Sequence, residues 1–242
     1  MFWRYGRRDG ISVSDAKEVL ATIVGHDDKD GTSLPQSMIE KAKEIKPVKK
    51  VAIVKEFMQG ENAACALEKM KAQGVEVVEV DAGILLQAKA AWAILSSAEF
   101  CNNVSRYDGV KYGYRAKGCH TIEDIYVKSR SEAFGIDVKT AILYGSHVLS
   151  SENYEKMYDK ALRVRRLIKE YFDKLFVSVD AVMLPACSKK VEDGSAVDVY
   201  EESFYTAPAS ITGLPVVVSA GVQWLGNAFA EGSLLAFSKQ LA

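Results

Sequence analysis

Residues 51–80 constrain the fold more than any other part of the sequence. Residues 51–54 form a short apolar run, Val-Ala-Ile-Val, of the kind found in strands that are buried on both faces. Residues 63–73 carry apolar side chains at helical spacing, and residues 75–80 are rich in valine. The 30 residues from the first strand to the end of the second match the length of a parallel, right-handed βαβ crossover. The sequence therefore predicts an α/β fold, in which this unit has an architectural role.

The rest of the chain continues the alternation of helices and strands. Ser12 and Asp15 form a Ser-x-x-Asp capping box, which predicts the start of an amphipathic helix. Apolar periodicity predicts helices over residues 12–24, 84–103, 121–130, 150–176 and 231–241, and strands over residues 179–184 and 216–219. Loops are expected at residues 26–33 and 188–198, and a turn at residues 211–215. No repeat or low-complexity linker interrupts the sequence, so we expect a single α/β unit over residues 1–242.

The charge balance excludes one class of function. The chain has 31 Lys and Arg against 32 Asp and Glu, a net charge of −1, and a pI of about 6.3. Nucleic-acid-binding domains that depend on bulk positive potential usually have a pI above about 9. The apolar runs are far shorter than the roughly 20 residues of a membrane span, and the N-terminus has no apolar signal-peptide region. We expect a soluble, cytoplasmic protein with no membrane contact.

Cysteine and histidine spacing gives no support for a metal or cofactor site. The four cysteines lack a Cys-x-x-Cys pair, and the three histidines lack zinc-site spacing. The cysteines are expected to be free thiols, and neither a metal nor a cofactor is expected; they are Cys65, Cys101, Cys119 and Cys187. Ser146 and His147 are adjacent, but no Gly-x-Ser-x-Gly elbow surrounds them, so a structural role is favoured over a nucleophile–base pair.

Basic side chains follow one flank of the helix expected at residues 150–176. They could touch RNA phosphates, but acidic residues are interleaved with them, which is more typical of a solvated helix face. The basic residues are Lys156, Lys160, Arg163, Arg166 and Lys169.

The segment at residues 105–115, SRYDGVKYGYR, is the strongest candidate for a functional surface. It holds three tyrosines, two arginines, one lysine and two glycines in eleven residues. Aromatic hydroxyls and cations beside glycine turns suit a pocket or an interface. A well-packed structural loop would have the same composition, so the residues alone leave both interpretations open.

The same segment resembles the amidase signature family, and within it the branch formed by the A subunits of the glutamyl-tRNA(Gln)/aspartyl-tRNA(Asn) amidotransferases. The resemblance is carried by blocks in the same order as in that family, at residues 24–30, 105–115, 129–135, 154–176, 205–215 and 221–229. It covers nearly the whole chain but only the C-terminal half of the family's pattern. It implies a three-layer α/β architecture with a mixed sheet and helices on both faces, as a single partial amidase signature domain.

The resemblance also implies an activity that these residues do not supply. Amidase signature enzymes use a Ser–cis-Ser–Lys triad, and the family's triad lies upstream of the residues matched here. Two Ser-Ser pairs are present, at residues 96–97 and 150–151, and neither has flanking glycines that would let backbone N–H groups form an oxyanion hole. We therefore expect no catalytic residue in this chain and no hydrolysis of glutamine by the chain alone.

Two substitutions affect the family's glutamine contacts. The arginine expected to hold the substrate α-carboxylate is replaced in the stretch that contains Thr140 and Ala141, and the acidic partner of the α-amino group aligns with Ser203. Charge-assisted contacts of this kind provide much of the selection for a free amino acid. The segment at residues 218–221 is also shorter than in the family.

Three hypotheses follow from the resemblance. The chain could pair with a separate N-terminal amidase half inside an amidotransferase, it could be a non-catalytic interaction module or pseudoenzyme that binds amidotransferase subunits, or it could be a vestigial truncated product. A sheet that lacks its other half would expose an edge and apolar surface, so we expect a protein partner. Any contact with tRNA is expected to be indirect. The candidate pocket or interface residues are Arg106, Tyr107, Asp108, Tyr112, Arg115, Arg130 and Ser203.

Overall fold

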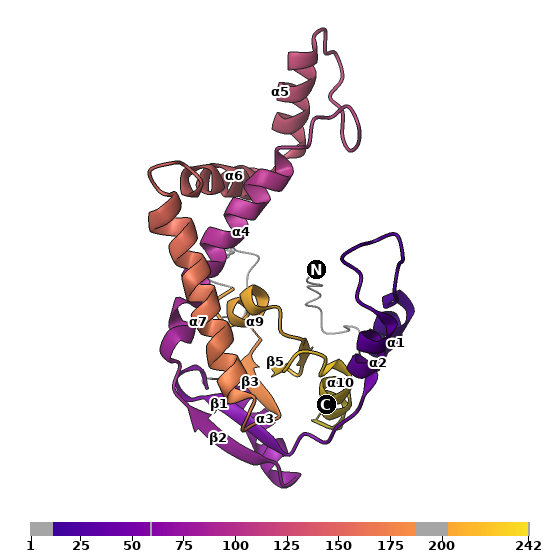
Figure 1. Cartoon of the computed structure of the whole chain (residues 1–242), viewed down its shortest axis with the longest axis vertical. Helices are drawn as coiled ribbons and strands as arrows, with labels where there is room; N and C mark the ends of the chain where they lie inside the picture. The colour runs from indigo at the N-terminus through magenta and orange to yellow at the C-terminus, as the bar shows by residue number, and fades with distance from the viewer. Residues whose placement is uncertain (1–11, 59, 187–202, 242) are drawn as a thin grey trace. The chain divides into compact units, whose positions relative to one another are not determined.

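A computed structural model describes residues 12–58, 60–186 and 203–241 (Figure 1). Contacts divide the chain into two compact units. The first, here the sheet unit, comprises Met1–Leu86 and Ile168–Ala242, and the second, the helical unit, comprises Gln87–Leu167. The expectation of a single domain stays a prediction.

Helices and strands are interspersed along the chain. The helices are α1 (Val13–Ile23), α2 (Gln36–Lys43), α3 (Glu61–Ala72), α4 (Ala88–Val104), α5 (Ile122–Ala133), α6 (Ile136–Val148), α7 (Lys160–Leu175), α9 (Ala207–Thr212) and α10 (Glu231–Leu241). Shorter helical turns are η1 (Lys55–Phe57), η2 (Gly83–Gln87) and the π-helical η3 (Tyr154–Asp159). The strands are β1 (Lys50–Val54), β2 (Glu76–Val80), β3 (Ala181–Pro185), β4 (Val216–Ser219) and β5 (Val222–Gly226).

The five strands form one mixed sheet in the order β2-β1-β3-β5-β4. β1 pairs in parallel with both β2 and β3, and β5 pairs antiparallel with β3 and β4. The predicted strand–helix–strand unit is confirmed as β1-α3-β2 with parallel pairing, and the predicted α/β fold with a mixed sheet is confirmed.

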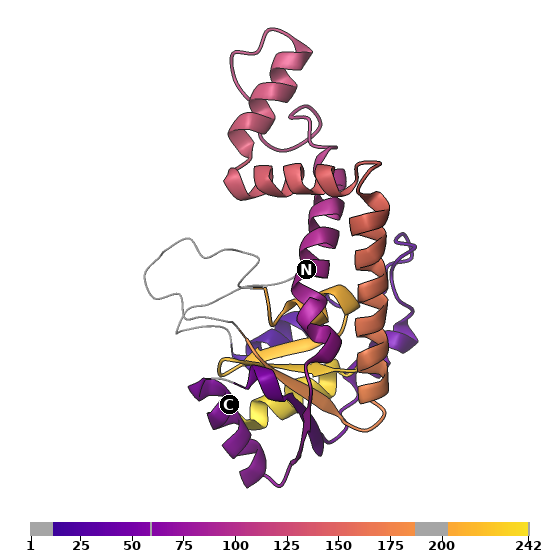
Figure 2. The same cartoon turned by 90° about the vertical axis from the view of Figure 1, so that its left-hand side faces the viewer.

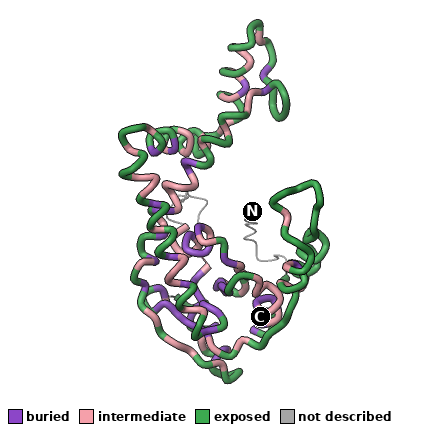
Figure 3. The backbone as a smooth tube through the Cα atoms, viewed as in Figure 1, coloured by how far each residue is buried: buried purple, intermediate pink, exposed green. Residues whose placement is uncertain are grey.

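Apolar side chains cover both faces of this sheet. On one face, strand residues such as Val51, Met183 and Trp224 form a buried cluster with Met70 of α3 and Leu234 of α10. The strand residues that alternate with them face the other way and are fully buried as well, namely Ala52, Val54, Val182, Leu184 and Leu225. Figure 2 shows the strands between α3 and the part of α7 that belongs to the sheet unit. The sheet is therefore the middle layer of a three-layer arrangement (Figure 3).

Several predicted boundaries are confirmed and others are wrong. α1 begins at the predicted capping box, in which Ser12 Oγ accepts from Asp15 N at 3.1 Å and Asp15 Oδ2 accepts from Ser12 N at 2.9 Å. The strand predicted at residues 179–184 and the terminal helix are present as β3 and α10. Cys65, Cys101 and Cys119 are free thiols, as predicted, whereas Cys187 and residues 188–198 lie outside the described residues.

Several elements differ from the prediction. Residues 150–176 are not one α-helix, because residues 151–153 form a turn and η3 is a π-helix before α7 begins. Residues 84–86 belong to η2, so the long helix starts later than predicted, at Ala88. Residues 211–212 are the end of α9, and the chain turns only at Gly213, whose φ of 70° lies in the left-handed region. α2, α6 and β5 had no predicted counterpart, because short or uniformly apolar segments carry little periodicity.

No helix among the described residues combines the length and apolar character that crossing a membrane requires.

α4 and α6 pack together in the helical unit at a glycine, which gives a testable prediction. A Cβ at Gly145 would overlap the Ser97 carbonyl oxygen on α4. In an open helix, Gly→Ala would gain up to about 1 kcal/mol from helix propensity. We expect Gly145→Ala instead to destabilise the chain by about 1–3 kcal/mol, because the two helices must move apart. Urea denaturation followed by circular dichroism measures the change. Gly25→Ala is the matched control, since no atom lies within 4 Å of its added Cβ, and a stabilising effect of Gly145→Ala would contradict this packing.

The carboxyl group of Glu231, at the start of α10, gives a prediction about pH. Its Oε2 atom is buried and has no hydrogen-bond partner among the described residues, and burial raises the pKa of Glu231 above the usual value. A raised pKa in the folded state means that the neutral acid favours folding below the unfolded pKa, and that this contribution is lost as the pH rises through the folded pKa. We expect Glu231→Gln to be more stable than the parent chain near neutral pH, with the difference shrinking toward about pH 4.

Thermal denaturation at several pH values measures this difference. Glu18→Gln on the exposed face of α1 is the control, and it should show no comparable gain. A Glu231→Gln chain that is less stable than the parent near neutral pH would contradict the prediction.

Candidate functional site

The loop at residues 105–121 joins α4 to α5 and contains most of the predicted site residues. Asp108 shapes its first turn, because its Oδ1 atom accepts hydrogen bonds from Val110 N at 2.7 Å and from Lys111 N at 3.1 Å. These backbone N–H groups hold the pKa of Asp108 below its usual value. The carboxylate is thus used to fix the turn of the loop.

Arg130 of α5 ties this loop to the end of α4. Its Nη1 atom donates to the carbonyl oxygens of Val104 and Tyr107, each at 2.8 Å. Its guanidinium carbon also lies 5.1 Å from the centroid of the Phe134 ring. Val104 is the last residue of α4, and its carbonyl oxygen also accepts from Tyr107 N at 3.0 Å, so Arg130 adds a second, charged donor at the end of this helix.

Tyr107 is the centre of a small aromatic cluster. Its ring centroid lies 5.2 Å from that of Phe134 and 5.7 Å from that of Tyr112, and its hydroxyl donates to Tyr114 O at 3.0 Å. Gly113 has a φ of 77° and lies so close to the Tyr107 ring that a Cβ could not fit. The loop therefore closes over Tyr107 only with glycine at this position.

Ser129 is a second anchor, which the sequence analysis missed. It is fully buried, and its Oγ atom accepts from Ala116 N at 3.0 Å. Gly109, with a φ of 71°, packs directly against the Ser129 side chain. Tyr114 adds a third link by donating its hydroxyl to the Glu132 carboxylate, which raises the pKa of Tyr114 above its usual value. A serine between polar neighbours on an exposed helix carries no sequence signal of burial, so only the fold reveals this role.

The predicted site residues therefore fall into three groups. Tyr107, Asp108 and Arg130 are engaged in the contacts that hold the loop. Arg106, Tyr112 and Arg115 are exposed, and Tyr112 has 55% of its surface accessible. Ser203 belongs to the sheet unit, where its carbonyl oxygen accepts from Thr206 N and Ala207 N at the start of α9. The structure thus brings six of the seven residues together in one loop–helix segment of the helical unit, and whether they bind a ligand stays a prediction.

The loop at residues 105–121 combines a fixed backbone with a polar exposed surface. The bonds to Arg130 and Ser129 position the chain, while exposed cations and phenol groups remain available to an anionic or aromatic partner. This arrangement is suited to binding. No group of three His, Cys, Asp or Glu side chains that could hold a metal ion occurs in the described part of the chain.

The two Ser-Ser pairs lie in different local structures. Ser97 is 2% exposed in α4, and Ser96 Oγ lies 3.4 Å from Ala93 O. Ser150 and Ser151 lie in a bend and a turn after α6, and Ser150 Oγ donates to His147 O at 2.8 Å. Thr140 Oγ1 on α6 donates within its own helix, to Ile136 O at 2.9 Å. The hydroxyls of Ser96, Thr140 and Ser150 thus each lie within hydrogen-bond distance of a backbone carbonyl.

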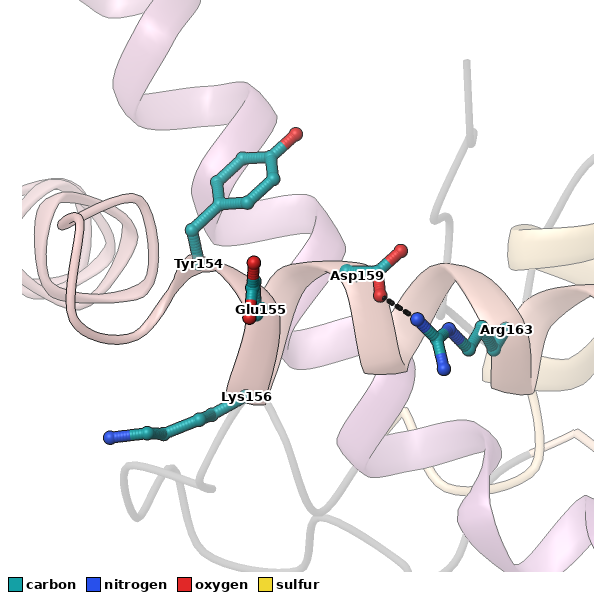
Figure 4. Close-up of a pocket in the computed structure, with 5 residues that line it drawn as sticks. All are labelled: Tyr154, Glu155, Lys156, Asp159 and Arg163. Carbon is teal, nitrogen blue, oxygen red and sulfur yellow. Dashed lines mark hydrogen bonds and ion pairs between the residues drawn. The ribbon is translucent and has the colours of Figure 1, made fainter.

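Two surface hollows are lined by residues outside the loop at residues 105–121. One, of about 590 Å³, runs along η3 and the start of α7 and is lined by Tyr154, Glu155, Lys156, Asp159 and Arg163 (Figure 4). In this hollow, Arg163 forms an ion pair with Asp159 at 2.5 Å, so these two side chains neutralise each other's charge. The other, of about 580 Å³, lies in the sheet unit between α3 and the β4–β5 turn. None of the seven predicted site residues is among the described residues that line either hollow.

Comparison with known proteins assigns the family. A family model described as Amidase matches residues 10–235. The chain belongs to the amidase family. The A subunit of glutamyl-tRNA(Gln) amidotransferase from Neisseria meningitidis serogroup C is 34% identical over 95% of this chain and 53% of its own length. The corresponding protein of Clostridium botulinum strain Alaska E43 is 35% identical over the same shares of the two chains.

Solved structures agree on the fold of this amidase chain. The A subunit of the glutamyl-tRNA(Gln) amidotransferase of Thermotoga maritima matches 93% of this chain and 49% of its own, with a TM-score of 0.61 and 23% identity. A bacterial aryl acylamidase of the amidase signature family matches 95% of this chain and 51% of its own, with a TM-score of 0.65 and 15% identity. The chain thus spans about half the length of the relatives it matches, and the predicted family and fold are confirmed.

The anchoring role of Arg130 gives a testable prediction. Arg130→Met keeps much of the side-chain volume but removes both donors to the carbonyls of Val104 and Tyr107. We expect a loss of about 1–3 kcal/mol in the free energy of unfolding of this segment, since the two carbonyls lose a charged partner. Hydrogen exchange at residues 105–116 should become faster.

Arg115→Met on the exposed side of the same loop is the control and should leave exchange unchanged. Unaltered exchange in Arg130→Met would show that Arg130 is free to act as a ligand-binding side chain instead.

Proposed function

We propose that this amidase-family chain acts like the C-terminal half of the A subunit within a glutamyl-tRNA(Gln) amidotransferase, where it contributes structure and binding but does not hydrolyse glutamine by itself. The observation that carries the proposal is the alignment of 95% of the chain with about half of that protein. A chain that aligns along this much of one half is expected to share the fold of that half.

The proposed lack of independent activity is supported by the local environment of the serines. Ser97 is buried, and the Ser150 hydroxyl is engaged with a helix carbonyl. An amide hydrolase needs an exposed, activated hydroxyl beside oxyanion-binding N–H groups. The replacement of the expected arginine in the stretch with Thr140 and Ala141, and of the expected acid by Ser203, also argues against selection of free glutamine.

The second candidate function is a non-catalytic interaction module, or pseudoenzyme, that binds intact amidotransferase subunits. The exposed part of the loop at residues 105–121 favours it, because Arg106, Tyr112 and Arg115 present cations and an aromatic ring on a loop whose backbone is already fixed. A fixed loop loses little conformational entropy on binding a partner. A vestigial product is the third interpretation, and it predicts no partner. A cytoplasmic location and the absence of direct tRNA contact remain part of the proposal.

Affinity purification of the tagged chain from its own cells, with mass spectrometry of co-eluting proteins, distinguishes these functions. We expect the other amidotransferase subunits to co-elute with a polypeptide that carries the amidase signature. Recovery of the intact A subunit with this chain would favour the interaction module. Recovery of the chain alone, or with chaperones only, would overturn the proposal.

A glutaminase assay on the purified chain tests its activity. We expect ammonia release from glutamine at the background rate, because Ser97 is buried and the Ser150 hydroxyl is engaged with His147 O. The intact A subunit from Neisseria meningitidis, within its own amidotransferase, is the positive control. Ammonia release by the chain alone that persists after gel filtration would contradict the proposed inactivity.

A further inference from the structure

Gln223 is a polar residue in the middle of a completely buried strand. β5 reads Val-Gln-Trp-Leu-Gly, and each of its five residues is buried. Gln223 is 1% exposed and lies on the same face of the sheet as Leu225, opposite the face to which Trp224 belongs. Burial of an amide group is costly unless the group is hydrogen-bonded. The amide at this position therefore calls for partners that an apolar side chain would not need.

The side-chain amide of Gln223 joins two backbone segments that are distant in sequence. Its Nε2 atom donates to Pro185 O at 2.8 Å and to Tyr205 O at 2.7 Å, and these two bonds use both of its hydrogens. Because both partners are carbonyl oxygens, only the nitrogen side of the amide fits here. Pro185 is the last residue of β3, and Tyr205 lies in the turn before α9. One planar group thus fixes the end of a strand against this turn.

The turn at residues 203–206 contains Ser203, the predicted site residue of the sheet unit. The carbonyl oxygen of Ser203 accepts from Thr206 N at 3.2 Å and from Ala207 N at 2.8 Å. The backbone of Ser203 is therefore tied to the start of α9, and a shift of the turn would move both together.

The same turn packs against the end of β1. The ring centroid of Phe57, in η1 directly after β1, lies 5.3 Å from the ring centroids of both Phe204 and Tyr205. β1 and β3 are neighbouring parallel strands, and β2 lies on the other side of β1, so the strand order reverses here. Open α/β sheets place ligand sites outside the carboxyl ends of strands at such a reversal. A fixed backbone at this place favours binding.

We infer that Gln223 is a positioning residue: its two hydrogen bonds hold the turn at residues 203–206, and with it Ser203, at the carboxyl ends of β1 and β3. Gln223 acts through the backbone of Pro185 and Tyr205, while Ser203 stays the predicted binding residue. All of these contacts lie within the sheet unit, so the inference does not depend on the partners named in the proposed function.

Hydrogen exchange at the amides of Thr206 and Ala207 measures how firmly the turn is held, because both amides donate to Ser203 O. Gln223→Met keeps an unbranched side chain of similar size but removes both donors. We expect exchange at these amides to become about tenfold faster relative to global unfolding measured in urea, because two carbonyls lose a donor. Leu225→Ala is the matched control. It destabilises the same buried strand and leaves both bonds intact, so it should not change this ratio.

Gln223→Glu adds a pH profile that simple filling of space would not produce. An ionised carboxylate has no donor for the two carbonyl oxygens, whereas the neutral acid has one O–H donor. Burial raises the pKa of an introduced carboxyl group, so the neutral acid forms as the pH falls. After correction for intrinsic exchange, we expect fast exchange at Thr206 and Ala207 near pH 7 and partial recovery of protection toward about pH 5. The parent chain should show no such recovery.

A measurement on the unaltered chain does not depend on how the variants fold. In NMR spectra, the side-chain nitrogen of Gln223 should show scalar couplings across the hydrogen bonds to the carbonyl carbons of Pro185 and Tyr205. Its two protons should exchange slowly with water.

Several outcomes would overturn the inference. Absence of both couplings, unchanged exchange in Gln223→Met, an equal increase in Leu225→Ala, or no recovery in Gln223→Glu at low pH would each do so. Failure of the amidotransferase subunits to co-elute from the source cells would count against the proposed function alone, since these measurements use the purified chain.

Discussion

The parallel pairing of β1 with β3 is the constraint on which the sheet unit depends. The two strands are far apart in the chain, and the Asp180 carboxylate joins them by accepting from the amides of Lys49 and Lys50 at 2.8 and 2.9 Å. β2 then adds to the free side of β1, and the β4–β5 hairpin adds to the free side of β3. Because the paired residues are buried on both faces, a shift in this register would place each apolar side chain against the wrong layer and disrupt the packing of both.

The helical unit is stabilised by helix packing and by polar contacts to one loop. α4 and α6 pack closely at Gly145, while the loop at residues 105–121 is held by polar anchors from α5. Arg130 and Ser129 bond backbone groups of the loop, so side chains with the appearance of a binding site are used to build it. Arg106, Tyr112 and Arg115 are among the exposed residues of this segment, which another molecule can reach.

Local sequence patterns were sufficient to predict the βαβ unit, the capped first helix and the terminal helix, and motif blocks in a fixed order were sufficient to predict the family. These features depend on local periodicity and on motifs that neighbouring residues complete. Three others became evident only in the folded chain: β5 is a central strand, residues 154–159 are π-helical, and Ser129 and Arg130 anchor the loop rather than lie on an open helix face. The physical reason is that burial and hydrogen-bond partners come from residues distant in sequence, so a short apolar segment or a single polar side chain carries no local sign of its neighbours.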